Sequence, residues 1–292
     1  MGADVENVYD GVFSGCNNIE YLELYCKNIN YWVNSFKKSV REIKIGSTVE
    51  RVAKGAFQDF VVLEKCEFEN GKMCQIDFEN EYANPLYYTK HLIIGGKEVT
   101  EFYVPEDVEQ IGSYAFVNCT GLTKVEGLKN LTRIGAGAFM GCEKLRTIGI
   151  PDGVTKIEKH TFYDCKRMTE IRIGTGVESI ENMAFNGCPL VRIYNYAEFP
   201  QDCPTNVFSI VKPNCKLYVM EDSQDLYRVH KDWYEFDIQP MDAEALPVEA
   251  IENGDLPIGI TYDLNGRNLS QTKKGLNIIR FPDGTTKKVM IR

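Results

Sequence analysis

Residues 143–165 read EKLRTIGIPDGVTKIEKHTFYDC and residues 166–188 read KRMTEIRIGTGVESIENMAFNGC, so one pattern occurs twice in succession. Each copy contains a short alternating stretch, a turn, a Val-x-x-Ile pair, a Phe and a Cys. A fixed period in the twenties is typical of stacked short repeats. The pattern therefore predicts a repeat solenoid, mainly β, in which each repeat forms one coil and contacts only its neighbours.

Alternation within the repeat predicts which side chains face inward. Ile148 and Ile150 alternate with Thr147 and Gly149, which fits a short strand with one buried face. Pro151-Asp152-Gly153 marks the corner that follows this strand. We expect the Val-x-x-Ile pair and the Phe of each repeat to line the opposite wall of the coil.

Two series of residues should form structural ladders along the stack. The phenylalanines 23 residues apart are Phe116, Phe139, Phe162, Phe185 and Phe208, and the cysteines that follow the first four are Cys119, Cys142, Cys165 and Cys188. Free Cys is a small and commonly buried residue, so we expect these thiols to be unbridged. We leave undecided whether Cys66 pairs with Cys74, or Cys203 with Cys215, in a disulfide, because these cysteines do not follow the 23-residue spacing of the ladder.

Weaker copies extend the period toward the N-terminus. They place Phe13, Phe36 and Phe57 in the first three coils. We divide the long interval between Phe57 and Phe116 into two enlarged coils, with Leu86 at the Phe position, and we treat residues 61–98 as irregular. This division predicts nine coils, of which the last contains Phe208.

The repeat L-x-x-I-x-I-P-x-x-V-x-x-I-x-x-x-A-F-x-x-C resembles the BspA-like (Treponema pallidum type) leucine-rich repeat over about residues 1–238. Residues 84–119 are similar to segments of such proteins from Bacteroides-like bacteria. The resemblance implies a right-handed coil with short turns and 3-10 segments. It also implies an exported or cell-surface bacterial protein that binds other macromolecules, as adhesin-like relatives do.

The last coil needs a cap, because the exposed end of a stack is apolar. We expect Leu217 and Val219 to continue the strand ladder, and a helix to begin at Asp222 or Ser223 and to end near Tyr234. The side chains expected to cover the last coil are Leu226, Tyr227, Trp233 and Phe236. The repeat domain would then span residues 1–238.

Residues 239–255 have the character of an acidic linker, and residues 256–292 predict a small antiparallel β-module of three short strands. Asn265-Gly266 and Pro282-Asp283-Gly284 are the turn signals. Residues 262–267 and 287–292 resemble the end of the C-terminal modules of Bacteroidetes exported proteins, including type IX sorting domains. A small β-module that merely ends the chain is the alternative.

Composition excludes some functions. The net charge of −9 argues against a nucleic-acid partner, which requires a basic face. No run of residues is long and apolar enough to span a membrane, and the N-terminus lacks the pattern of a signal peptide. We expect that the signal peptide has been trimmed before Met1-Gly2, and that the protein is extracellular or located on the bacterial cell surface.

The sequence contains no recognisable catalytic motif. His91, His160 and His230 are dispersed, and no Cys/His grouping has zinc spacing. We therefore predict no catalytic residue, no metal ligand and no cofactor. An enzyme that uses two carboxylates within residues 61–98 is the less favoured alternative, and an acidic pocket there would support it.

The outward strand positions form the candidate partner-binding surface, on what we expect to be the concave face. Its residues are Glu101, Tyr103, Lys124, Glu126, Glu170, Arg172, Arg192, Tyr194, Lys216 and Tyr218. Tyr and Arg are common interface hot spots.

We expect a monomer that binds an unknown protein or glycan, for example in host extracellular matrix. A glycan-binding accessory protein would use the same tyrosines as stacking platforms. Alternatively, Glu101–Lys124 and Glu170–Arg192 are only cross-strand pairs that keep the sheet soluble.

Overall fold

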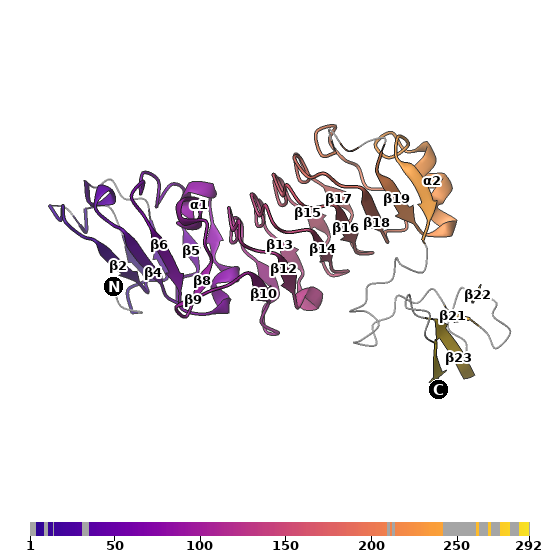
Figure 1. The fold of residues 1–292 in the computed structure, drawn as a ribbon, viewed down its shortest axis with the longest axis horizontal. Helices are drawn as coiled ribbons and strands as arrows, with labels where there is room; N and C mark the ends of the chain where they lie inside the picture. The colour runs from indigo at the N-terminus through magenta and orange to yellow at the C-terminus, as the bar shows by residue number, and fades with distance from the viewer. Residues whose placement is uncertain are drawn as a thin grey trace. The chain divides into compact units, whose positions relative to one another are not determined.

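The computed structural model describes residues 4–8, 11–13, 15–30, 35–208, 211 and 214–241, together with four strands between residues 261 and 291. The chain divides into two compact units, Met1–Ile238 and Gln239–Arg292. The first, called here the repeat unit, is a stack of coils whose strands run side by side (Figure 1).

The longer strands, together with the two-residue strands β8 and β9, form one wall of the repeat unit in three hydrogen-bonded groups. The first group contains β2 (Tyr21–Leu24), β4 (Glu42–Ile45), β6 (Lys65–Phe68), β8 (Ile93–Ile94) and β9 (Lys97–Glu98). The second contains β10 (Glu101–Tyr103) and β12 (Lys124–Glu126), and the third contains β14 (Thr147–Ile150), β16 (Glu170–Ile173), β18 (Arg192–Asn195), β19 (Lys216–Val219) and β20 (Asp237–Pro240). Ile148 and Ile150 are buried, which confirms the predicted alternation.

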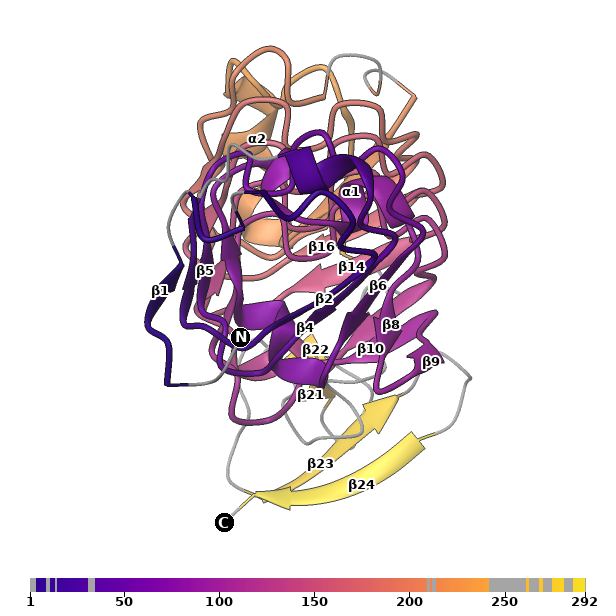
Figure 2. The ribbon, with the colours of Figure 1, turned by 90° about the vertical axis from the view of Figure 1, so that its left-hand side faces the viewer.

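Two-residue strands form a second wall, which Figure 2 shows from the end of the stack. They are β1 (Asn7–Val8), β3 (Asn28–Ile29), β5 (Arg51–Val52), β7 (Asp77–Phe78), β11 (Gln110–Ile111), β13 (Arg133–Ile134), β15 (Lys156–Ile157) and β17 (Ser179–Ile180). All their pairings are parallel. Val154 and Ile157 are buried behind this wall, as predicted.

The third wall is a recurring turn in which two left-handed residues, four positions apart, enclose the Phe. The pairs are Tyr114/Asn118, Gly137/Gly141, His160/Asp164 and Met183/Gly187. Positive φ is uncommon for residues other than glycine, so surrounding contacts must maintain this turn. The backbone supplies them: Phe116 N donates to Ala138 O at 2.8 Å, and Phe139 N donates to Thr161 O at 2.9 Å.

The five predicted phenylalanines form a continuous ladder of stacked rings. Neighbouring ring centroids lie 5.2, 5.6, 5.3 and 5.5 Å apart from Phe116 to Phe208, and the ring planes agree within 6°. This spacing is close to the distance between adjacent strands, because each coil advances by about one strand width. Phe102 packs edge-on against Phe116 at 4.9 Å, so the parallel stacking starts at Phe116.

The predicted cysteine ladder is tied to the ring ladder. Cys142 Sγ donates a hydrogen bond to Phe116 O at 3.2 Å, and Cys165 Sγ donates to Phe139 O at 3.2 Å. Each thiol therefore satisfies a carbonyl of the preceding coil. All ten cysteines are free, so neither Cys66/Cys74 nor Cys203/Cys215 is bridged.

The irregular coils keep the core continuous by other means. Leu86 is fully buried at the start of α1 (Leu86–Thr89), where the repeat would place a Phe. Asn84 Nδ2 donates to Tyr114 O at 2.8 Å, which connects this coil to the next.

Phe57 is fully buried and Phe13 only partly so, whereas the side chain of Phe36 lies outside the described residues. The 3-10 segments of the first eight coils are η1 (Ser35–Lys38), η2 (Gly71–Gln75), η3 (Glu81–Ala83) and η4 (Leu128–Asn130).

The end of the repeat unit contains η5 (Glu221–Ser223) and α2 (Gln224–Val229). Trp233 and Phe236 each lie 5.3 Å from the ring of Phe208. The helix ends at Val229, not near Tyr234, because His230 adopts an extended conformation. Leu226 is exposed, contrary to the prediction. Successive helical residues differ by about 100° in direction, so the burial of Tyr227 turns Leu226 outward.

The second unit contains four strands, one more than predicted. They are β21 (Thr261–Tyr262), β22 (Asn268–Leu269), β23 (Gly275–Arg280) and β24 (Thr286–Ile291), in the antiparallel order β22-β21-β23-β24. Both predicted turn signals, Asn265-Gly266 and Pro282-Asp283-Gly284, and residues 242–255 of the predicted linker lie outside the described residues.

Replacing Phe162 with Ala should lower the free energy of unfolding by about 3–5 kcal/mol, because the change removes one ring from the packed ladder. Chemical denaturation would measure the change. Phe199→Ala is the matched control, since this ring is 65% exposed and should contribute little. A loss below ~1 kcal/mol for Phe162→Ala would contradict the ladder.

A thiol-specific reagent at pH 8 should modify one cysteine in the folded protein and ten after unfolding in guanidinium. Cys16 is exposed and the other nine are buried. Burial raises the pKa of Cys74 and Cys215 to about 12, so these thiols stay protonated and unreactive. Fewer than ten reactive thiols after unfolding would reveal a disulfide.

Candidate functional site

Strand register places the predicted binding residues on the outward face of the longer strands, called here the sheet face. Glu101 lies beside Lys124, and Tyr103 beside Glu126. The remaining pairings in register are Glu170 with Arg192, Arg172 with Tyr194, Arg192 with Lys216, and Tyr194 with Tyr218. β12 and β14 belong to different hydrogen-bonded groups, so the candidates form one cluster on β10–β12 and another on β16–β19.

Glu170 is the centre of charge in the second cluster. Its Oε1 lies 2.9 Å from Arg172 Nη2, and its Oε2 accepts from Arg192 Nε at 3.1 Å. The predicted cross-strand pair Glu170–Arg192 is therefore formed. In the first cluster, Lys124 pairs with Glu126 on its own strand. Much of the charge on the sheet face is compensated within the face itself.

Arg172, Tyr194 and Tyr218 form a stacked column across three strands. The guanidinium carbon of Arg172 lies 4.6 Å from the ring centroid of Tyr194, and the rings of Tyr194 and Tyr218 lie 4.7 Å apart at 17°. Tyr194 is consequently only 2% exposed. The expectation that Tyr194 contacts a partner directly is wrong, because its neighbours in register cover both faces of its ring.

The side chains available to a partner lie at other positions. Tyr103 is 60% exposed and packs over Gly127, where a Cβ atom would lie 3.1 Å from its ring. Lys124, Arg192 and Lys216 are also exposed. Between the two clusters, the outward residues of β14 are Thr147 and Gly149. Their side chains are small, so few side-chain atoms of β14 project from the sheet face.

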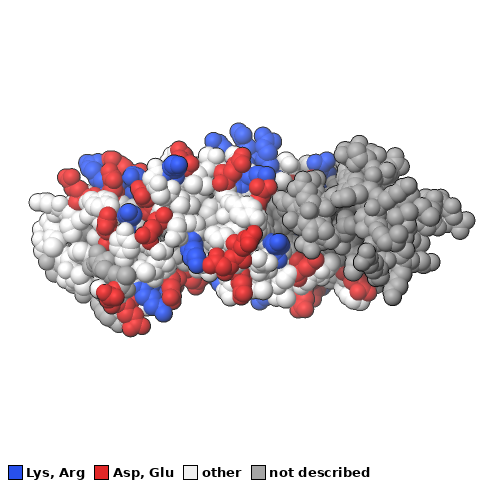
Figure 3. Space-filling view, turned by 90° about the horizontal axis from the view of Figure 1, so that it is seen from below, with Lys and Arg blue, Asp and Glu red and all other residues white. Residues whose placement is uncertain are grey.

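Acidic and basic side chains are interspersed on the side of the repeat unit that Figure 3 shows. Charged side chains of neighbouring coils also pair with each other, for example Lys166 with Glu143 and Lys156 with Glu181. Exposed pairs of this kind contribute little stability. They leave a surface of mixed charge on this side.

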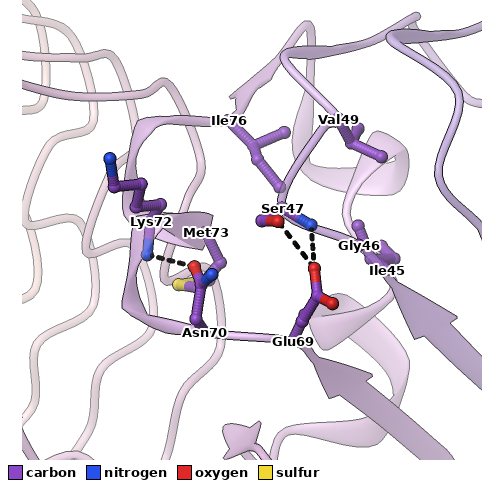
Figure 4. A pocket seen from close by; sticks show the side chains of 9 residues that line it. All are labelled: Ile45, Gly46, Ser47, Val49, Glu69, Asn70, Lys72, Met73 and Ile76. Carbon is purple, nitrogen blue, oxygen red and sulfur yellow. Dashed lines mark hydrogen bonds between the residues drawn. The ribbon is translucent and has the colours of Figure 1, made fainter. Parts of the chain in front are cut away.

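A small pocket borders the irregular coils, where the enzyme alternative required two carboxylates. Figure 4 shows its nine lining residues, among which Glu69 is the single carboxylate. Glu69 Oε2 accepts from Ser47 N at 2.8 Å and from Ser47 Oγ at 2.6 Å, and these hydrogen bonds lower the pKa of Glu69. The arrangement joins two turns and does not supply the carboxylate pair of a glycosidase.

One cluster of possible metal ligands escaped the sequence analysis. Asp202, His230 and Asp232 bring one ligand atom each within 4.8 Å of one another. The ammonium of Lys231 already lies 2.9 Å from Asp202 Oδ1 and 2.7 Å from Asp232 Oδ2. Only the short spacing of His230 and Asp232 signals this cluster in the sequence, since Asp202 belongs to the preceding coil.

None of the helices in the described part of the chain has the length and apolar character needed to cross a bilayer.

The stack of short parallel strands and ring-bearing turns defines a leucine-rich-repeat protein. A family model described as "BspA type Leucine rich repeat region (6 copies)" matches residues 1–82 and 95–212, which is more than half of the chain. The chain belongs to this family. A search of curated proteins finds no match.

Solved structures with a similar fold come from several bacteria. A leucine rich cell surface protein from Faecalibacterium prausnitzii shares 18% identity, with 98% of this chain and 57% of that chain covered and a TM-score of 0.35. A leucine-rich repeat protein from Bacteroides ovatus shares 15%, with 75% and 54% covered and a TM-score of 0.47. A T. pallidum leucine rich repeat protein shares 19%, with 76% and 92% covered and a TM-score of 0.38. The chain spans just over half the length of the first two.

Tyr194→Ala should destabilise the protein by about 2–4 kcal/mol, because it opens a cavity between Arg172 and Tyr218. Tyr103→Ala, on the same face, should change stability by less than ~0.5 kcal/mol. Thermal denaturation of both variants would test this contrast. Equal effects would mean that the column does not form.

Proposed function

We propose that this protein is a secreted or cell-surface bacterial protein that binds other proteins through the exposed part of its sheet face, in the manner of an adhesin. The observation that supports this most is the exposure of Tyr103 on β10, Arg192 on β18 and Lys216 on β19, all on hydrogen-bonded strands of the sheet face. Tyrosine and arginine are enriched among interface hot spots. A preformed surface also loses little conformational freedom on binding.

Recognition by this surface requires no chemistry, cofactor or metal. The protein would act as a monomer on a partner such as a host extracellular-matrix protein. We further propose that residues 215–240 cap the stack, and that the second unit is a C-terminal module of the kind found in exported Bacteroidetes proteins. The family match supports a role in interaction, since leucine-rich-repeat proteins bind partners through their repeats.

An array of extracellular-matrix proteins and glycans would test the proposal. We expect saturable binding to a protein, weakened at least about fivefold by Tyr103→Ala and by Arg192→Glu. Tyr234→Ala is the matched control, because Tyr234 is similarly exposed but lies outside the sheet face.

Two outcomes would contradict this function. Protein binding that is unaffected by both sheet-face variants would place the interaction elsewhere on the chain. Binding to glycans alone would instead favour the glycan-binding accessory protein.

A further inference from the structure

After each ladder cysteine, the chain passes through a short corner into the next longer strand. Residues 143–146 form this corner before β14, and residues 166–169 form it before β16. Lys166 Nζ lies 2.6 Å from Glu143 Oε1 across the two corners. Because this contact joins residues one repeat apart, equivalent positions of the two corners lie side by side.

Both corners expose cations around a buried apolar residue. Leu145 and Met168 are fully buried. Their neighbours Lys144, Arg146 and Arg167 are all exposed. Lys144 and Arg167 occupy equivalent positions, so these two cations lie next to each other on adjacent coils.

Lys90 extends this group of cations toward the N-terminus. It directly follows α1 and comes four residues after Leu86, as Glu143 comes four residues after Phe139. The pKa of Glu143 is lowered, first by the hydrogen bond from Lys166 and further by nearby charges that include Lys90. The five cations, called here the basic corner, are Lys90, Lys144, Arg146, Lys166 and Arg167.

Most of the positive charge of the basic corner is not compensated by carboxylates. Glu143 pairs with Lys166, and Asp164 also attracts Lys166. The other four cations form no ion pair with any residue that the structure describes. Elsewhere on the repeat unit, Arg192 and Lys156 each have a carboxylate partner. In a chain with a net charge of −9, the basic corner is therefore a local site of attraction for anions.

The corner suits a flexible, highly charged chain better than a folded protein. The centre of a protein interface is usually apolar and depleted of charge. Residues 143–146 and 166–169 expose no large apolar side chain. Binding here would come from charge-assisted hydrogen bonds, which Lys and Arg make with oxyanions.

Nucleic acid fits the basic corner less well. The bases of a single strand stack on aromatic side chains, and residues 143–146 and 166–169 include none. A double helix needs a broad basic face, whereas the adjoining strands carry Glu126 and Glu170. A linear sulfated polysaccharide carries its anionic groups along one narrow chain, so it can follow a row of cations from coil to coil.

We propose that the basic corner binds a linear sulfated polysaccharide, which lies along the stack and is held by its sulfate groups. The site goes beyond the proposed function, because its ligand belongs to a different class and none of its residues belongs to the sheet face. The protein would thus carry two separate recognition surfaces, one for a protein and one for an anionic glycan.

Isothermal titration calorimetry with a heparin oligosaccharide tests this site. We expect saturable binding at low salt that weakens steeply as the salt concentration rises. The double variant Lys144→Gln with Arg167→Gln should bind at least about tenfold more weakly. Lys54→Gln with Lys129→Gln is the matched control, since it removes two exposed cations outside the corner, and it should bind within about twofold of the wild type. Both double variants should keep the wild-type melting temperature, because the replaced side chains are exposed.

The inference is overturned if heparin does not bind, if desulfated heparin binds equally well, or if both double variants lose affinity to the same extent. Tighter binding of DNA or of poly-L-glutamate than of heparin would also overturn it, in favour of a nucleic acid or an acidic protein segment. Tyr103→Ala should leave heparin binding unchanged. A loss in this variant would place the polysaccharide on the sheet face and remove the basic corner as its site.

Discussion

The structure depends on the stacking of equivalent side chains at the distance between adjacent strands. From Phe116 to Phe208, ring centroids lie 5.2–5.6 Å apart, so every ring contacts the ring above and the ring below. The left-handed residues around each ring, the backbone bonds between turns and the thiol bonds to Phe carbonyls all hold this spacing. A core of this kind is one-dimensional, and its stability is close to a sum over neighbouring coils.

The same constraint decides which surface residues are available for binding. Side chains in register contact each other first, so Tyr194 is enclosed by Arg172 and Tyr218 although it lies on the outward face. Two accessible positions lie beside an interruption of the ladder. Tyr103 precedes a break between hydrogen-bonded groups of strands, and Gly149 follows that break. Departures from the repeat therefore change which positions on this face are exposed.

Periodicity in the sequence was sufficient to predict the repeat, the inward direction of Ile148 and Ile150, and the Phe and Cys ladders, because each depends only on position within the repeat. It also placed Leu86 in the core of an enlarged coil. The burial of Tyr194 could not be predicted, since it depends on the conformations of two neighbouring side chains. The meeting of Asp202 with His230 and Asp232 depends on how α2 folds back, which no repeat position encodes.

The second left-handed residue of each turn affects how coils can be added to or removed from the stack. Its occupants alternate as Asn118, Gly141, Asp164 and Gly187. A Cβ at Gly141 would lie 2.2 Å from Asn118 Oδ1, and a Cβ at Gly187 would lie 2.3 Å from Asp164 Oδ1, so each polar side chain occupies the space above the next glycine. Removing one coil would place two side chains, or two glycines, in succession. Along this row, deletion of a coil that carries a glycine would put two side chains in succession, whereas duplication or deletion of a pair of coils keeps the alternation.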